Sequence, residues 1–169
     1  MMTLGDVNRL DEPAFVRTFG DIAEHSPWVA ERAHDAAPFE SREDLIQAFE
    51  TAMRTAEHAA KLSLIRAHPD LAGKAAIAGE LAEDSRKEQA GAGLDQLNEA
   101  EFAEFTQLNT AYQEKFGFPF IFAVKGSTKH MILEAFAARI GNDRDEEFNI
   151  ALTQIARIFR FRLEERITA

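Results

Sequence analysis

The sequence contains no cysteine, and it has no long apolar run. Without cysteine the chain cannot form disulfides, use a thiolate nucleophile or bind a metal through sulfur, and this composition is compatible with a reducing compartment. No apolar stretch approaches the ~20 residues that a helix needs to cross a bilayer. We therefore expect neither cysteine chemistry nor a membrane span.

Basic residues are outnumbered, with 19 Lys and Arg against 29 Asp and Glu, which gives a formal net charge of -10. A broad acidic field repels polyanions, so we expect no nucleic-acid partner and no anionic membrane partner. An anionic small molecule would need a local basic pocket. Residues 1–7 lack the basic start of a secretory signal and residues 167–169 are no peroxisomal tripeptide, so a cytoplasmic location is expected.

The 169 residues are 46% hydrophobic and 28% charged, as in an ordinary soluble globular chain. This length suits one domain with one core, which we expect to span residues 1–169. Helix-start signals recur along it, and apolar residues follow them at spacings of three and four. The pattern predicts an all-α domain, a helical bundle of about eight helices. The proposed helix starts are Asp11 with Pro13, Ser26 with Pro27, Ser41 with Asp44, Asn98, Gly126 with Ser127, and Asp143.

Two stretches depart from this pattern. Residues 71–93 are rich in glycine and alanine, which predicts short helical pieces joined by turns. Residues 118–124 are aromatic and β-branched and contain Pro119, which predicts a short extended segment. That segment could be plain core, or its main-chain groups could bind a flat, amide-rich ligand.

The tripeptide His68-Pro69-Asp70 follows an apolar helical run. A residue before proline is pushed out of the α region, so we expect His68 at a helix exit. An imidazole held there can donate or accept a proton near neutral pH, or can simply bond to a backbone carbonyl. A metal site with His58 and Asp70 is a weaker alternative, because the spacing matches no familiar ligand pattern.

Two further motifs could serve structure or function. Ser85 and Glu88 form a capping-box pattern, which could simply cap a helix. Alternatively, the first turn of this helix could bind an anionic ligand, with Glu88 and Gln89 forming hydrogen bonds to the amide groups of that ligand. Arg162 lies near the centre of the apolar stripe of the last helix. The stripe is formed by Phe148, Leu152, Ile155, Ile158 and Phe159. Arg162 therefore needs an anion, either an internal carboxylate such as Glu88 or a ligand carboxylate.

Together these segments resemble the 2-oxo-4-hydroxy-4-carboxy-5-ureidoimidazoline (OHCU) decarboxylases of purine breakdown. The likeness runs nearly end to end, and several ordered motifs are more specific than one tripeptide. The matching segments are residues 24–30, 64–74 around His68, Ser85 with Glu88 and Gln89, 115–121, and Arg162 with Leu163.

The resemblance implies conversion of OHCU to (S)-allantoin and CO2 without metal or organic cofactor, in an all-helical homodimer. It makes His68 the catalytic proton donor, with Glu88 and Arg162 as polar partners. It also implies a set of substrate-binding residues: Pro69, Ser85, Arg86, Lys87, Glu88, Gln89, Phe120, Ile121, Phe122, Ala123 and Val124.

Two other functions remain open from the residues alone. A J-type co-chaperone module also carries the His-Pro-Asp tripeptide, but after a strongly basic helix, whereas the helix before His68 offers mainly Lys61 and Arg66. A noncatalytic helical domain could bind the same ligand without turnover.

Overall fold

The computed structural model describes residues 1–169, apart from the side chain of Lys74. Its helices confirm the all-α prediction, since the described residues contain no strand beyond one isolated β-bridge. There are ten helices along this described part, where about eight were expected. They are α1 (Leu4–Asn8), α2 (Glu12–Phe19), α3 (Trp28–His34), α4 (Arg42–Arg54), α5 (His58–Ala67), α6 (Lys74–Ala78), α7 (Glu83–Gly91), α8 (Glu99–Phe116), α9 (Lys129–Arg139) and α10 (Arg144–Arg166).

The larger number of helices comes from short elements. Helix α1 has only five residues, too few to show an apolar period, and a capping box between Thr3 and Asp6 defines its start. The 71–93 stretch contains two helices, as its composition predicted. Gly79, at a φ of 71°, ends α6 in the left-handed conformation that glycine adopts without strain.

Most of the predicted helix starts are confirmed. Asp11 and Ser41 accept hydrogen bonds from the amides of Ala14 and Asp44, and Asn98 forms a capping box. Two of the predicted starts were wrong. The N-cap of α3 is Pro27, while the Ser26 hydroxyl donates to the Glu24 carbonyl; Thr128 caps α9 in place of Gly126 and Ser127.

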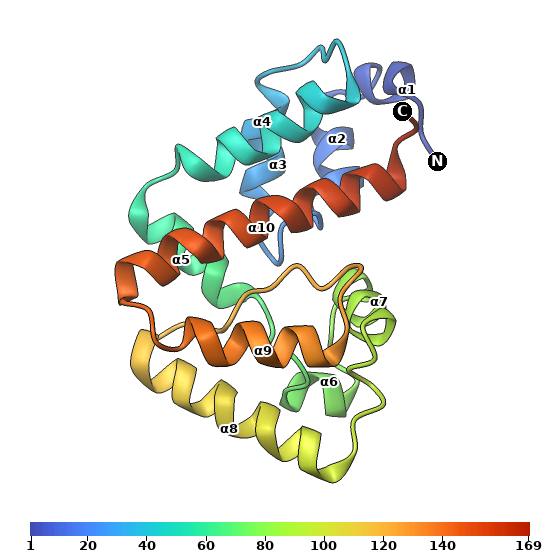
Figure 1. Cartoon of the computed structure of the whole chain (residues 1–169). Helices are drawn as coiled ribbons and strands as arrows, with labels where there is room; N and C mark the ends of the chain where they lie inside the picture. Colours follow the sequence, from blue (N-terminus) through green and yellow to red (C-terminus); the bar gives the residue numbers. More distant parts are fainter. The chain divides into compact units, whose positions relative to one another are not determined.

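The chain groups into two compact units. Unit 1 comprises Met1–Ala67 and Ala156–Ala169, where α3 packs against α2 and α4. Phe15, Phe19 and Phe49 are fully buried in its core. The two ends of the chain lie side by side in this unit, since the Met2 amide donates to the Arg166 carbonyl over 2.9 Å (Figure 1).

Unit 2 comprises His68–Ile155, and in it α8 packs against α9 (Figure 1). Its core is aromatic: the Phe120 and Phe136 rings stack with centroids 3.8 Å apart. Tyr112 donates a hydrogen bond of 2.6 Å to the fully buried Glu147, which also pairs with Arg139. Burial and the Glu147 charge raise the pKa of the Tyr112 hydroxyl.

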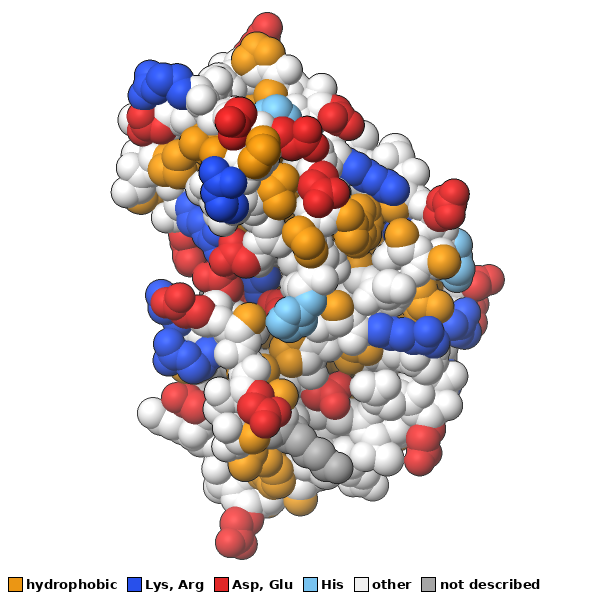
Figure 2. Space-filling model, turned by 180° about the vertical axis from the view of Figure 1, so that it is seen from behind, with side chains coloured by type: hydrophobic (Ala, Val, Ile, Leu, Met, Phe, Trp, Pro, Cys, Tyr) orange, Lys and Arg blue, Asp and Glu red, His pale blue; other side chains and the backbone are white. Residues whose placement is uncertain are grey.

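Segment 118–124 connects α8 to α9 and is not helical, as predicted. The prediction of one domain over residues 1–169 stays a prediction. Figure 2 shows acidic side chains distributed among basic and hydrophobic ones on the face drawn there, in a chain of net charge -10. Among the described residues, no helix combines the length and hydropathy that a bilayer crossing requires.

Candidate functional site

His68 follows directly on the last residue of α5, Ala67, so the predicted helix exit is confirmed. The physical reason is Pro69, whose ring disfavours helical backbone at the preceding residue. The His68 side chain is only 7% exposed, and its Nε2 atom is buried. The sequence thus holds an imidazole in a largely dry environment at the start of unit 2.

The 69–73 turn follows His68 and is held by a buried amide on α7. Gln89 accepts a hydrogen bond of 3.0 Å from the Ala72 amide through Oε1, and its Nε2 donates to the Asp70 carbonyl over 3.3 Å. Gln89 was predicted to read substrate amides. In the structure, one donor and one acceptor of its side chain bond to the turn.

The backbone of this turn is tightly folded. Ala72 has a φ of 53°, a left-handed conformation that costs a residue with a side chain roughly 1–2 kcal/mol. A Cβ at Gly73 would lie 2.7 Å from the Asp70 Cβ, closer than such atoms approach. Glycine is therefore required at position 73 for this conformation.

Asp70, whose role the sequence did not assign, is a partly buried carboxyl in this turn. Burial raises its pKa, because desolvation disfavours the charged form, and a hydrogen bond from Gln113 opposes that change. The Gln113 Nε2 lies 3.2 Å from Oδ1 of Asp70. The side chain of Asp70 is thus directed to α8.

The capping prediction for Ser85 was wrong. Helix α7 begins at Glu83, its N-cap is Ala82, and Ser85 lies buried in the first turn. The helix starts earlier because Glu83 and Asp84 interact favourably with the positive end of its dipole. The same two carboxylates disfavour an anion at this helix end. Arg86 and Lys87 are exposed, and Glu88 is partly buried.

Main-chain groups of segment 118–124 bind to the protein itself. The Ile121 carbonyl accepts a hydrogen bond of 2.6 Å from Arg139, and the Ala123 amide donates to Gln154 over 3.0 Å. The Phe120 ring lies in the aromatic core with the Arg139 guanidinium 4.3 Å from its centroid. The Phe120 side chain is therefore packed in the core, while Phe122 is more exposed than its neighbours.

Arg162 lies in unit 1 and is buried on the α10 stripe, as predicted, with 3% of its side chain exposed. Its Nη2 pairs with Glu24 over 2.9 Å, and its Nη1 donates to the Ile22 carbonyl over 3.1 Å. The sequence reasoning named Glu88 as an internal partner and missed Glu24. A signal was available, because Glu24 begins the 24–30 motif.

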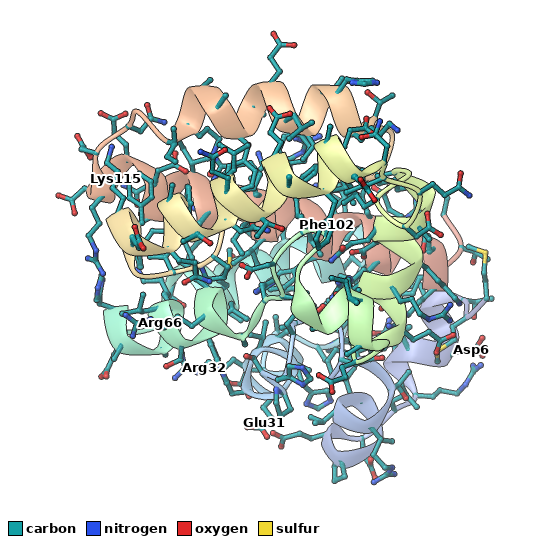
Figure 3. The ribbon with its side chains drawn as sticks, turned by 90° about the horizontal axis from the view of Figure 1, so that it is seen from below. Asp6, Glu31, Arg32, Arg66, Phe102 and Lys115 are labelled. Atoms are coloured by element: carbon teal, nitrogen blue, oxygen red, sulfur yellow. The ribbon has the colours of Figure 1, made fainter. Side chains whose placement is uncertain are left out.

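Two cavities adjoin the 69–73 turn within unit 2. One, of about 420 Å³, is lined by Arg86 and Gln89, two predicted site residues, together with Phe102, which is labelled in Figure 3. The other, of about 690 Å³, is lined by Asp70 and Asn109. Among the described residues, no group of three or more histidines and carboxylates is placed to hold a metal ion. His68 lines neither of these two cavities, and its buried imidazole is a group of the kind that can transfer a proton.

Comparison with known proteins adds to this geometry. The family model described as OHCU decarboxylase matches residues 8–164. A 2-oxo-4-hydroxy-4-carboxy-5-ureidoimidazoline decarboxylase of Haloferax volcanii is 42% identical over 168 residues, covering 99% of this chain and 98% of the relative. A uric acid degradation bifunctional protein of Bacillus subtilis is 43% identical, covering 99% of this chain but 33% of the relative.

Among solved structures, the crystal structure of an (S)-allantoin synthase is similar with a TM-score of 0.80 and 31% identity. The match covers 99% of this chain and 54% of that one, so this chain spans about half the length of the synthase. A crystal structure of OHCU decarboxylase in the presence of (S)-allantoin matches with a TM-score of 0.72 and 21% identity, which shows a shared fold.

Proposed function

This chain belongs to the OHCU decarboxylase family, and from that premise we propose that it converts OHCU to (S)-allantoin and CO2, with His68 as the proton donor. The observation that carries the reaction is the family match over residues 8–164. Decarboxylation of OHCU is a step of urate degradation, and it makes the protein a carbon–carbon lyase. The role of His68 rests on its motif and its burial at the exit of α5.

The reaction needs one electron acceptor and one placed proton. The bond between the ring carbon and the carboxylate breaks, CO2 leaves, and the electron pair moves into the adjacent C=N of the ring. The resulting ene-type intermediate then takes a proton on the carbon that carries the ureido group. The neighbouring hydroxyl becomes the ring carbonyl of allantoin, and its proton neutralises the ring nitrogen that received the electron pair. No metal ion or organic cofactor is required in this route, because the substrate's own imine accepts the electrons.

Stereochemistry is the part that the protein must control. Protonation of a free intermediate from both faces gives a racemate, so an (S)-specific product requires a donor fixed on one face. His68 suits this task because it is buried and lies beside a turn held by side-chain hydrogen bonds. Its imidazole regains the proton from solvent after each turnover.

We propose substrate contacts at the positions that the resemblance assigns. Ser85 and Gln89 are four residues apart and so share one face of α7, where both are buried. Glu88 and Arg162 are proposed as polar partners of the substrate. The remaining proposed contacts are Pro69, Arg86, Lys87, Phe120, Ile121, Phe122, Ala123 and Val124.

For three of these positions the geometry limits what the contact can be. The Ile121 carbonyl and the Ala123 amide already bond to Arg139 and Gln154, so they bind substrate only by sharing those bonds. Arg162 already pairs with Glu24. Its contribution to the substrate would therefore come from a guanidinium whose charge is largely balanced.

We also propose a cytoplasmic homodimer. The support is the resemblance, together with the absence of cysteine, which suits a reducing compartment. Light scattering on the purified chain gives its molar mass directly. A mass of twice 18.9 kDa is expected, and a mass of 18.9 kDa over the micromolar range would refute the dimer.

The function is tested with OHCU generated in place. Urate oxidase and a hydrolase that acts on its product convert urate to OHCU in a cuvette. Circular dichroism then follows the appearance of (S)-allantoin after the chain is added. We expect (S)-allantoin to appear faster than in a blank without the chain. An unchanged rate would rule out the activity, and calorimetric binding of the ligand without CO2 release would instead indicate a binding domain.

A further inference from the structure

Asn109 connects the middle of α8 to the turn that follows His68. Its Nδ2 donates a hydrogen bond of 2.9 Å to the Leu71 carbonyl, 38 residues away in the sequence. Both residues are 7% exposed, so this bond is shielded from water. No motif or resemblance drew attention to Asn109.

The oxygen of the Asn109 side-chain amide is unfavourable for the stability of the fold. This atom, Oδ1, is buried and accepts no hydrogen bond from any residue that the structure describes. A buried acceptor without a donor is unfavourable, and an apolar residue of similar size would avoid that cost. Packing alone therefore does not account for an asparagine here. The useful part of the side chain is the donor that it directs to the turn.

The turn itself is fixed at several points. Gln89 bonds to the Ala72 amide and the Asp70 carbonyl, and Gln113 bonds to the Asp70 carboxyl. Asn109 holds the one carbonyl between them, that of Leu71. The strained φ of 53° at Ala72 persists because these bonds hold the backbone around it.

His68 is coupled to this turn through one residue. The ring of Pro69 fixes its φ near −65°. A displacement of the turn therefore moves the backbone of the preceding residue, His68, with it. A displacement of about 1 Å at a reacting group can cost roughly 10²-fold in rate. The placement of the turn therefore bears on where the imidazole lies.

We infer that Asn109 is a positioning residue for His68, which holds the 69–73 turn so that the imidazole delivers its proton to one face of the intermediate. This inference rests on the proposed function, specifically on His68 as the donor. Asn109 is not expected to touch the substrate. Its loss should affect the rate and the stereochemistry of the product more than substrate affinity.

The test compares Asn109→Leu with Gln107→Leu, the same kind of substitution at an exposed position two residues earlier on α8. For Asn109→Leu we expect kcat to fall at least about tenfold, KM to stay within about twofold, and the enantiomeric excess of (S)-allantoin to drop. For Gln107→Leu we expect wild-type values. Circular dichroism and thermal melting establish that each variant is folded.

Asn109→Asp gives a second readout that also serves if the leucine variant does not fold. An ionised aspartate cannot donate to the Leu71 carbonyl, whereas a protonated one can. The kcat of this variant, divided by that of the wild type at the same pH, should therefore rise as the pH is lowered. A ratio that is flat with pH would overturn the inference.

His68→Ala in the same assay separates the two hypotheses. A slow His68→Ala variant beside an Asn109→Leu variant with wild-type kcat and enantiomeric excess would overturn the inference and leave the proposed function standing. A His68→Ala variant with the wild-type rate would remove His68 from the mechanism, and the positioning role of Asn109 would be lost with it.

Discussion

Arg162 and Glu24 form an ion pair of 2.9 Å in which both side chains are almost completely buried. They are 138 residues apart, and both belong to unit 1. Arg162 also bonds to the Ile22 carbonyl, so one guanidinium connects α10 to the loop between α2 and α3. Charges removed from water require such compensation.

Glu24→Gln should strongly destabilise the fold. The substitution keeps the shape but removes the negative charge that balances a buried guanidinium, which typically costs about 3 kcal/mol or more. The free energy of unfolding, measured by urea titration with circular dichroism, checks this. Glu43→Gln breaks the exposed pair of Glu43 with Arg160 and should cost less than about 1 kcal/mol. Equal losses in the two variants would show that burial of the Glu24 pair is energetically unimportant.

His68→Ala should lower the rate of (S)-allantoin formation by roughly 10²–10⁴-fold, the contribution of a positioned general acid. Initial rates from optical activity provide the measurement, and a wild-type far-ultraviolet spectrum establishes that the variant is folded. His130→Ala is the matched control, because His130 is exposed on α9 and should leave the rate unchanged. A comparable loss of rate in both variants would contradict a specific role of His68 in the reaction.

Gly73→Ala should destabilise the protein by roughly 1–3 kcal/mol and lower its activity. The new Cβ would lie 2.7 Å from the Asp70 Cβ, so the turn must shift to relieve the contact. Gly91→Ala is the opposite case, since a Cβ there meets no atom within 4 Å and the residue is helical. The free energy of unfolding of that variant should rise by about 0.5–1 kcal/mol, because alanine is the better helix former. Thermal melts decide, and a Gly73→Ala variant as stable as the wild type contradicts the predicted clash.

Asp70→Asn should raise the melting temperature at neutral pH. Burial raises the pKa of the Asp70 carboxyl in the folded state above the value of 3.8 that it has in the unfolded chain. The folded state therefore binds this proton more tightly, and ionisation of Asp70 lowers stability as the pH rises from about 3.8 through the folded pKa. The gain from asparagine should be largest above that range and should vanish below it. Melting curves between pH 3 and pH 7 test this, and a gain that does not change with pH would assign it to packing.

Local signals in the sequence were sufficient to predict most helix boundaries. Asp11, Ser41 and Asn98 each accept a hydrogen bond from the amide three residues ahead, so their effect on a helix start does not depend on the rest of the fold. Pro69 ended α5 for an equally local reason. Ser85 misled because a capping-box pattern also fits residues inside a helix, and two acidic residues placed the start of α7 earlier.

The helical class, the position of His68 at a helix exit and the burial of Arg162 could be predicted from the sequence, because each depends on the periodicity or on an adjacent residue. The pairing of Glu24 with Arg162 and the bonds of Gln89 and Asn109 to the 69–73 turn became evident in the folded chain. These partners are 17 to 138 residues apart. Such contacts depend on how helices pack, and the local pattern of side chains carries no record of that packing.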